Sequence, residues 1–126
     1  MNKPKILLVE DTEFSQLIIS QKLIKYGYEF EIAANGEEAL MQLTTEKFDL
    51  VLMDIEMPVL NGIEATKIIR SSDSYELKNM IIVALTAYSG DEYKKKFMDI
   101  GFNDLLVKPF KDEDFQTMMN NVWSGK

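Results

Sequence analysis

The amino-acid sequence predicts an α/β protein with a doubly wound, five-stranded parallel sheet and helices on both faces. Short apolar runs alternate five times with segments whose apolar residues recur at helical spacing. Strands that are apolar throughout indicate a parallel sheet covered on both sides, and right-handed crossovers wind its helices onto the two faces. The length of 126 residues favours a single domain over residues 1–126.

Each expected element has its own signal in the sequence. Strands are expected over residues 6–9, 29–33, 50–53, 80–85 and 105–107. Helices are expected over 13–26, after Asn35, after Asn61-Gly62, over 91–100 and around Phe115–Trp123. The first helix carries an imperfect apolar stripe of Phe14, Leu17, Ile18 and Ile24, and Gly27 stops it. The polar stretch 71–79 is expected to be a loop.

Composition excludes several classes of function. A net charge of −7 disfavours direct binding to nucleic acid. The chain has no Cys and no His, which excludes disulfides, thiolate nucleophiles, His-ligated zinc and a Ser-His-Asp triad. The apolar run Ile6–Val9 is too short for a signal peptide, and no segment is long enough to span a membrane. We therefore expect a cytoplasmic protein with no membrane contact in this segment.

Polar residues follow four of the five expected strands. Glu10-Asp11 follow the first strand, Asp54 the third, Thr86 the fourth and Lys108 the fifth. Ligands of such sheets bind beyond the carboxyl ends of the strands, so these side chains are expected at one edge. Taken singly, each has an ordinary interpretation, because Asp11 can cap a helix, Thr86 can stabilise a turn and Lys108 can lie on the surface.

Together these residues indicate phosphoryl chemistry at a metal site. Clustered carboxylates must protonate, separate or bind a cation, and ligand oxygens without His or Cys favour Mg²⁺. A metal ion, an ammonium and a hydroxyl can each hold one oxygen of a phosphoryl group. Asp54 lies centrally in this set and is the candidate nucleophile, since carboxylates form aspartyl phosphates. The side chain of Glu56 is expected in solvent.

Over essentially its whole length the chain resembles the receiver domain of two-component response regulators. The resemblance rests on "LLVEDTEF", "LVLMDIEMPVLNG", "VALTAYS" and "LLVKPF", which occur in the family's order and spacing. It implies a flavodoxin-like sheet with strand order 2-1-3-4-5 and a role in phosphorelay signalling. It also implies a phosphorylation switch with at most weak autophosphorylation and autodephosphorylation, rather than a turnover enzyme.

The resemblance also implies a role for each matching residue. Asp54 matches the phosphoacceptor. Asp11, Asp54 and the backbone carbonyl of Glu56 match the ligands of Mg²⁺, for which Mn²⁺ can substitute, and Glu10 matches the residue that holds metal-bound water. Thr86 matches the hydroxyl that turns toward the phosphoryl group, and Lys108 matches its ion-pair partner. A cis peptide bond is expected before Pro109.

The chain departs from the family at one switch position, where Leu105 stands in place of the usual aromatic residue. A readout that couples Thr86 to an aromatic ring at this position is therefore in question, whereas phosphorylation is not. Glu56 and Tyr88 flank the expected route of a hydrolytic water, and we hypothesise that they slow loss of the phosphoryl group. Tyr93, Phe97 and Lys94–Lys96 are the hypothesised partner surface.

Because the chain has no His, any phosphohistidine donor must lie on a different domain. The resemblance implies that this donor is a histidine kinase or a histidine phosphotransfer domain. The receiver is expected to be a monomer or weak dimer, either free-standing or part of a longer protein. Its motifs look more like those of receivers attached to hybrid sensor kinases than of DNA-binding regulators. Two alternatives stay open: a phosphatase of the haloacid-dehalogenase type, for which Asp54-Ile-Glu56 is an imperfect match, and a non-phosphorylated adaptor with the same fold.

Overall fold

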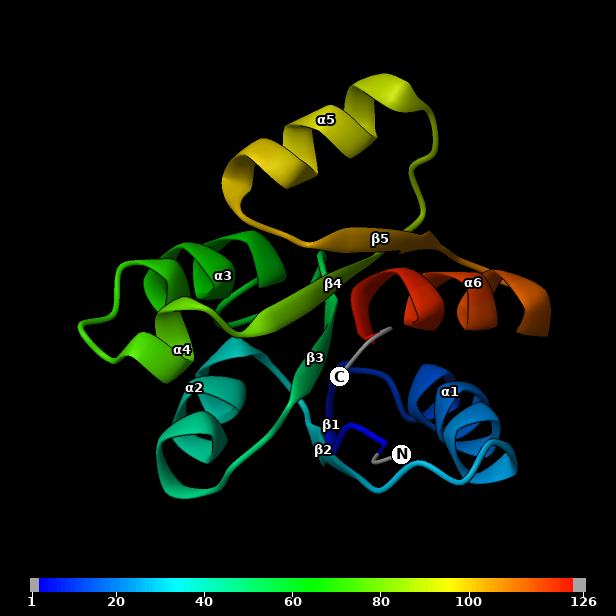
Figure 1. Cartoon of the computed structure of the whole chain (residues 1–126), viewed down its shortest axis with the longest axis horizontal. Coiled ribbons are helices and arrows are strands. Elements are labelled where there is room, and N and C mark those ends of the chain that lie inside the picture. Colours follow the sequence, from blue (N-terminus) through cyan, green and yellow to red (C-terminus); the bar gives the residue numbers. More distant parts are fainter. Residues whose placement is uncertain (1–2, 124–126) are drawn as a thin grey trace.

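In a computed structural model that describes residues 3–123, five parallel strands form one sheet (Figure 1). The strands are β1 (Ile6–Val9), β2 (Phe30–Ala33), β3 (Leu50–Asp54), β4 (Ile81–Thr86) and β5 (Asp104–Val107). Their order across the sheet is β2-β1-β3-β4-β5, and every neighbouring pair is parallel. The predicted fold class and strand order are thus confirmed.

Helices cover both faces of this sheet. They are α1 (Glu13–Lys25), α2 (Gly36–Thr45), α3 (Gly62–Arg70), α4 (Tyr75–Lys78), α5 (Asp91–Ile100) and α6 (Asp112–Trp123). Helices α1 and α6 lie on one face, and α2, α3 and α5 on the other (Figure 1). Among residues 3–123, no helix combines the length and apolarity that crossing a membrane requires.

The sheet separates two apolar cores because successive side chains of a strand point to opposite faces. On β1, Leu7 and Val9 face α2 and α3, whereas Ile6 and Leu8 face α1 and α6. All four residues of β1 and all five of β3 are buried. Such strands carry no polar side chain until they end, which is why Glu10 and Asp54 come at the strand tips.

Two sequence-based expectations are wrong. Tyr75–Lys78 forms the short helix α4, capped by the Ser74 side chain, inside the stretch that was expected to be a loop. On α1, the buried face is formed by Ile19, Ser20 and Leu23. The four residues of the predicted apolar stripe are exposed instead, with exposed fractions of 74% for Phe14, 57% for Leu17, 41% for Ile18 and 66% for Ile24.

A tight loop turns the chain away from the tip of β3 and into α3. Gly62 is the first residue of α3, and Asn61 caps the helix by accepting a hydrogen bond from the Glu64 amide. A Cβ atom on Gly62 would lie 2.1 Å from the backbone oxygen of Asp54, so only glycine allows this approach. The Asn61-Gly62 pair therefore begins a helix, as predicted, and leaves the Asp54 side chain free to face outward.

Candidate functional site

The ends of four strands enclose a cavity of about 300 Å³ at the carboxyl edge of the sheet. Its lining includes all five residues that the strand ends placed at this edge, together with Glu56: Glu10, Asp11, Asp54, Thr86 and Lys108. Three of these side chains are buried although they are polar, with exposed fractions of 1% for Glu10, 5% for Asp54 and 2% for Thr86. Buried polar groups need partners. Here the partners are the Lys108 ammonium for the two carboxylates and backbone amides for Asp54 and Thr86.

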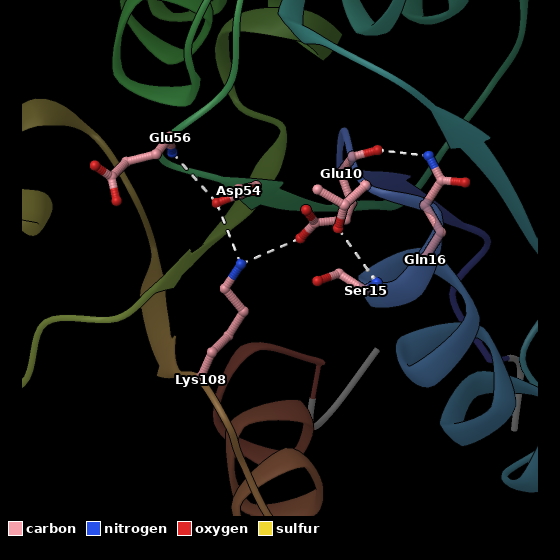
Figure 2. Close-up of polar contacts among 7 residues, drawn as sticks. Glu10, Ser15, Gln16, Asp54, Glu56 and Lys108 are labelled. Atoms are coloured by element: carbon pink, nitrogen blue, oxygen red, sulfur yellow. Dashed lines mark hydrogen bonds and ion pairs between the residues drawn. The ribbon is translucent and has the colours of Figure 1, made fainter.

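Lys108 links the two buried carboxylates. Its Nζ lies 3.2 Å from Oε2 of Glu10 and 3.5 Å from Oδ1 of Asp54. Figure 2 shows the lysine side chain extending from the end of β5 toward both acids. The backbone holds this arrangement, because the Lys108 amide donates to the Thr86 carbonyl at 2.7 Å. The Lys108–Pro109 peptide bond is cis, as predicted.

The Asp54 carboxylate also accepts a backbone hydrogen bond. The Glu56 amide donates to its Oδ1 at 3.2 Å, which fixes the orientation of the carboxylate relative to the loop. The side chain of Glu56 itself is exposed and points away from Asp54 (Figure 2). The expectation that this side chain lies in solvent is therefore confirmed.

The negative charges in the cavity are only partly balanced. Burial, with the neighbouring Asp54 carboxylate, raises the pKa of Glu10 to about 7, and Lys108 offsets only part of this rise. Burial also acts to lower the pKa of Lys108, but the carboxylates of Asp54 and Glu10 outweigh it, so that this pKa is raised. One ammonium thus faces two buried carboxylates and the nearby Asp11, an arrangement that favours a further cation.

The carboxylates are spaced to hold a metal ion. Glu10, Asp11 and Asp54 each offer one oxygen, and these oxygens lie within 4.8 Å of one another. A set of carboxylate oxygens without nitrogen or sulfur suits a hard divalent ion, and Mg²⁺ takes one or two carboxylates while it keeps several waters. The residues present therefore fit a hard cation, with room in the cavity for its waters.

The first turn of α1 completes the wall of the cavity, and the sequence analysis missed it. Thr12 caps α1 and lines the cavity together with Ser15. The Gln16 side chain donates to the backbone oxygen of Glu10 at 2.7 Å (Figure 2). The signal was available, since a helix that begins directly after β1 must place its first turn at the same edge as Glu10 and Asp11.

The hypothesised surface on α5 needs one correction. Phe97 is 2% exposed and belongs to the core, so it cannot be part of a partner surface. Lys94, Lys95 and Lys96 are exposed, and Tyr93 is half-buried. Tyr88 is 43% exposed and lies in the loop between β4 and α5.

Fold and site together define a doubly wound α/β domain with an acidic cavity at the carboxyl edge of its sheet, where three carboxylates could hold a metal ion. The family model for the response regulator receiver domain matches residues 6–120, and the chain belongs to this family. Receiver domains are phosphorylation-switch domains of phosphorelay signalling. The resemblance that was stated from four motifs is thereby confirmed.

A known relative and two solved structures agree with this assignment. The chain is 41% identical to hybrid signal transduction histidine kinase B of Dictyostelium discoideum. The match covers 91% of this chain but only 6% of that protein. This chain is also similar to the receiver domain of the sensor histidine kinase PA1611 from Pseudomonas aeruginosa. That structure was solved with magnesium in its active site cleft. The TM-score is 0.84 at 33% identity, over 96% of this chain and 98% of that one.

The second solved structure is a complex. It contains the Saccharomyces cerevisiae histidine phosphotransfer protein Ypd1 and the receiver domain of its response regulator Ssk1. Its similarity to this chain has a TM-score of 0.82 at 34% identity, covering 94% of this chain and 87% of that one.

Proposed function

We propose that Asp54 accepts a phosphoryl group from a phosphohistidine on a partner domain and that the modified site changes a partner-binding surface. The observation that carries this proposal is the position of Asp54. Its carboxylate ends a fully buried strand, faces the cavity and has the Lys108 ammonium at 3.5 Å from Oδ1. A nucleophile on a rigid strand beside a fixed cation is suited to phosphoryl transfer, which depends mainly on position and charge.

In the proposed transfer, a carboxylate oxygen of Asp54 forms a bond to phosphorus while the bond from phosphorus to the donor imidazole nitrogen breaks. The electron pair of that bond stays on the imidazole nitrogen. The imidazole leaves as a neutral ring when its other nitrogen already carries a proton, and otherwise it takes a proton from solvent. Lys108 places its positive charge near the phosphoryl oxygens, and the Thr86 hydroxyl can donate a hydrogen bond to one of them.

We assign the metal site to Asp11, Asp54 and the backbone carbonyl of Glu56, with Glu10 holding a metal-bound water. The metal is Mg²⁺ or, as a substitute, Mn²⁺. Bound there, it would neutralise charge on the phosphoryl oxygens. The chain's own contribution is to orient the two carboxylates, because the Glu56 amide and Lys108 contact Asp54 and Lys108 also contacts Glu10.

The exposed apolar face of α1 is the proposed docking surface for the donor. Phe14, Leu17 and Ile24 lie at i, i+3 and i+10 on one stripe of the helix and are all more than half exposed. The surface is continuous with the site, since Phe14 and Ile18 border a cavity of about 310 Å³ that Lys108 and Pro109 also line. An apolar stripe of this kind fits a helical partner, such as a histidine phosphotransfer domain or the histidine-bearing helices of a kinase.

Within this proposal the chain is a switch domain without turnover of its own. The wider protein is proposed to be a hybrid histidine kinase or a separate response regulator in the cytoplasm, with the receiver as a monomer or weak dimer. The chain spans only a small part of several of its relatives, 6% and 5% of two hybrid kinases.

The test is phosphorylation by a small acyl phosphate in the presence of Mg²⁺, followed by intact mass measurement. One added phosphoryl group is expected in the native chain, and none with Asp54→Asn or with a metal chelator. Asp73→Asn is the matched control, because Asp73 is exposed in the loop between α3 and α4. Modification of Asp54→Asn would refute Asp54 as the acceptor. Steady hydrolysis of phosphate esters by the native chain would instead favour the phosphatase.

A further inference from the structure

The loop after β4 connects the site to α5 through an aromatic row. Tyr88 lies in that loop, and its ring stacks on Tyr93 in the first turn of α5, with centroids 5.1 Å apart and planes at 17°. Tyr93 lies 6.4 Å from Phe97 one turn further along the helix, and Phe97 lies 5.9 Å from Phe102. The row thus runs from an exposed ring beside the site into the core.

The start of this row is hydrogen-bonded to the site itself. The Tyr88 backbone amide donates to Oγ1 of Thr86 at 3.0 Å. Thr86 is 2% exposed and lines the phosphorylation cavity. The orientation of the Thr86 hydroxyl therefore affects both the cavity and the backbone that carries the Tyr88 ring.

The row also has room to rearrange. Residues 87–90 are all exposed, and a Cβ atom on Gly90, which has φ 113°, would meet nothing within 4 Å. Tyr88 and Tyr93 border a cavity of about 570 Å³ that Glu56 and Lys96 also line. The Tyr88–Tyr93 stack thus lies between open space and the core, without close packing on all sides.

Leu105 cannot provide this connection. It pairs with Ala84 in the sheet register and packs against the same core as Tyr93, on the face that α5 covers. It is half-buried, but it carries no ring to stack and no hydroxyl to bond. Tyr88, by contrast, is bonded to the site's hydroxyl through its amide and stacked on α5 through its ring.

From this geometry we infer that the Tyr88–Tyr93 stack reports the state of Asp54 to α5, in the role that an aromatic residue at position 105 would otherwise have. The inference rests on the proposed function. A phosphoryl group on Asp54 brings strong acceptor oxygens into the cavity, and the Thr86 hydroxyl turns toward them. The Tyr88 amide then loses its acceptor, the loop moves to satisfy it, and the stacked ring carries the change to Tyr93.

The consequence is a changed surface on α5. Tyr93 shares its helix with the exposed residues Lys94, Lys95 and Lys96. Lys95 forms an ion pair with Asp99 at 2.9 Å. A shift of the first turn therefore alters an exposed surface that carries both basic and acidic side chains.

The test compares nuclear magnetic resonance spectra of chains with ¹⁵N-labelled amides and ¹³C-labelled tyrosine rings, before and after addition of acyl phosphate and Mg²⁺. Intact mass gives the phosphorylated fraction. In the native chain the Tyr88 amide and the Tyr93 ring resonances are expected to shift together. Absence of any added mass would sink the proposed function. Added mass with unchanged Tyr93 resonances would overturn the relay alone.

Two variants make the test specific. Tyr88→Leu keeps the backbone amide and an apolar side chain but removes the ring, and it should reduce the phosphorylation-dependent shift of Tyr93 at least twofold at equal phosphorylated fraction. Leu105→Ala is the control and should keep the full shift. The opposite pattern, with the shift lost in Leu105→Ala and kept in Tyr88→Leu, would assign the readout to position 105 and reject the inference.

Discussion

Helices α1 and α6 lie side by side on one face of the sheet, yet they use their apolar residues differently (Figure 1). Helix α6 buries Phe115, Met118 and Met119 against the strands. Helix α1 buries Ile19 and Leu23 but exposes four large apolar residues, among them Phe14 at 74%. The two helices have similar lengths of 13 and 12 residues, so the difference lies in which side chains each one leaves outside.

This difference in exposed apolar residues indicates that α6 serves mainly stability, whereas α1 also offers a surface for recognition. Burial of a large apolar side chain contributes roughly 1.5–3 kcal/mol to the free energy of folding. The buried residues of α6 each make such a contribution. The exposed apolar residues of α1 contribute little to folding, and contiguous apolar surface of this kind is typical of interaction sites. The helix that borders the phosphorylation cavity is thus the one with apolar surface left for a partner.

The largest expected effect is on stability and distinguishes the two helices directly. Phe115 is 1% exposed and its ring lies near those of Tyr26, Tyr28 and Phe110. Phe115→Ala should lower the free energy of unfolding by about 3–5 kcal/mol, because it leaves a cavity. Phe14→Ala should change it by no more than about 0.5 kcal/mol. Urea unfolding followed by circular dichroism measures both, and equal losses would mean that α1 is as much a core helix as α6.

The second effect is on phosphotransfer. Phe14→Ala with Leu17→Ala should slow transfer from a phosphorylated histidine domain by about tenfold or more, since a lost contact of 1.4 kcal/mol is a factor of ten. Phosphorylation by a small acyl phosphate should be unchanged, because that donor needs no docking surface. Met41→Ala is the matched control, as Met41 is 63% exposed but lies on α2. An equal slowing by Met41→Ala would show that the effect is not specific to α1.

The strands followed from their apolar runs and their order from the family resemblance, whereas neither predicted which side of α1 is buried. The strand runs such as Leu50–Met53 are apolar throughout and leave one interpretation. On α1, however, Ile19 and Leu23 form a second pair at i, i+4 beside the predicted stripe. Both stripes are apolar, so that the packing of α1 against the sheet, and not periodicity, decides which one is buried. Helix α4 has four residues, too few to show any period.

The candidate site was similarly predictable only in part. Asp54, Thr86 and Lys108 could be placed together because the ends of parallel strands meet at one edge. The hydrogen bond from the Tyr88 amide to Thr86 and the stack of Tyr88 on Tyr93 could not. Both depend on the conformation of the loop between β4 and α5, and loops carry no periodic signal in a sequence.

The smallest expected effect concerns the ion pairs that join α1 to α6. Asp112, in the first turn of α6, lies 2.7 Å from Nζ of Lys22 and 2.7 Å from Nζ of Lys25. Hydrogen bonds from Lys22 and then Lys25 hold the pKa of Asp112 well below its usual range. Because the pKa is lower in the folded chain than in the unfolded one, the ion pairs stabilise the fold above the unfolded value of about 3.9. This stabilisation is lost as the pH falls toward the folded value.

Asp112→Asn removes the ionisable group and should therefore flatten the acid side of the stability profile. Thermal unfolding between about pH 6 and 2 would compare the native chain with this variant. The difference in Tm should be constant above about pH 5 and should shrink as the pH falls, since only the native chain loses the pair. Glu113→Gln is a control in the same turn of α6, at an exposed position. Parallel profiles for the native chain and Asp112→Asn would mean that α1 is held against α6 by apolar contacts alone.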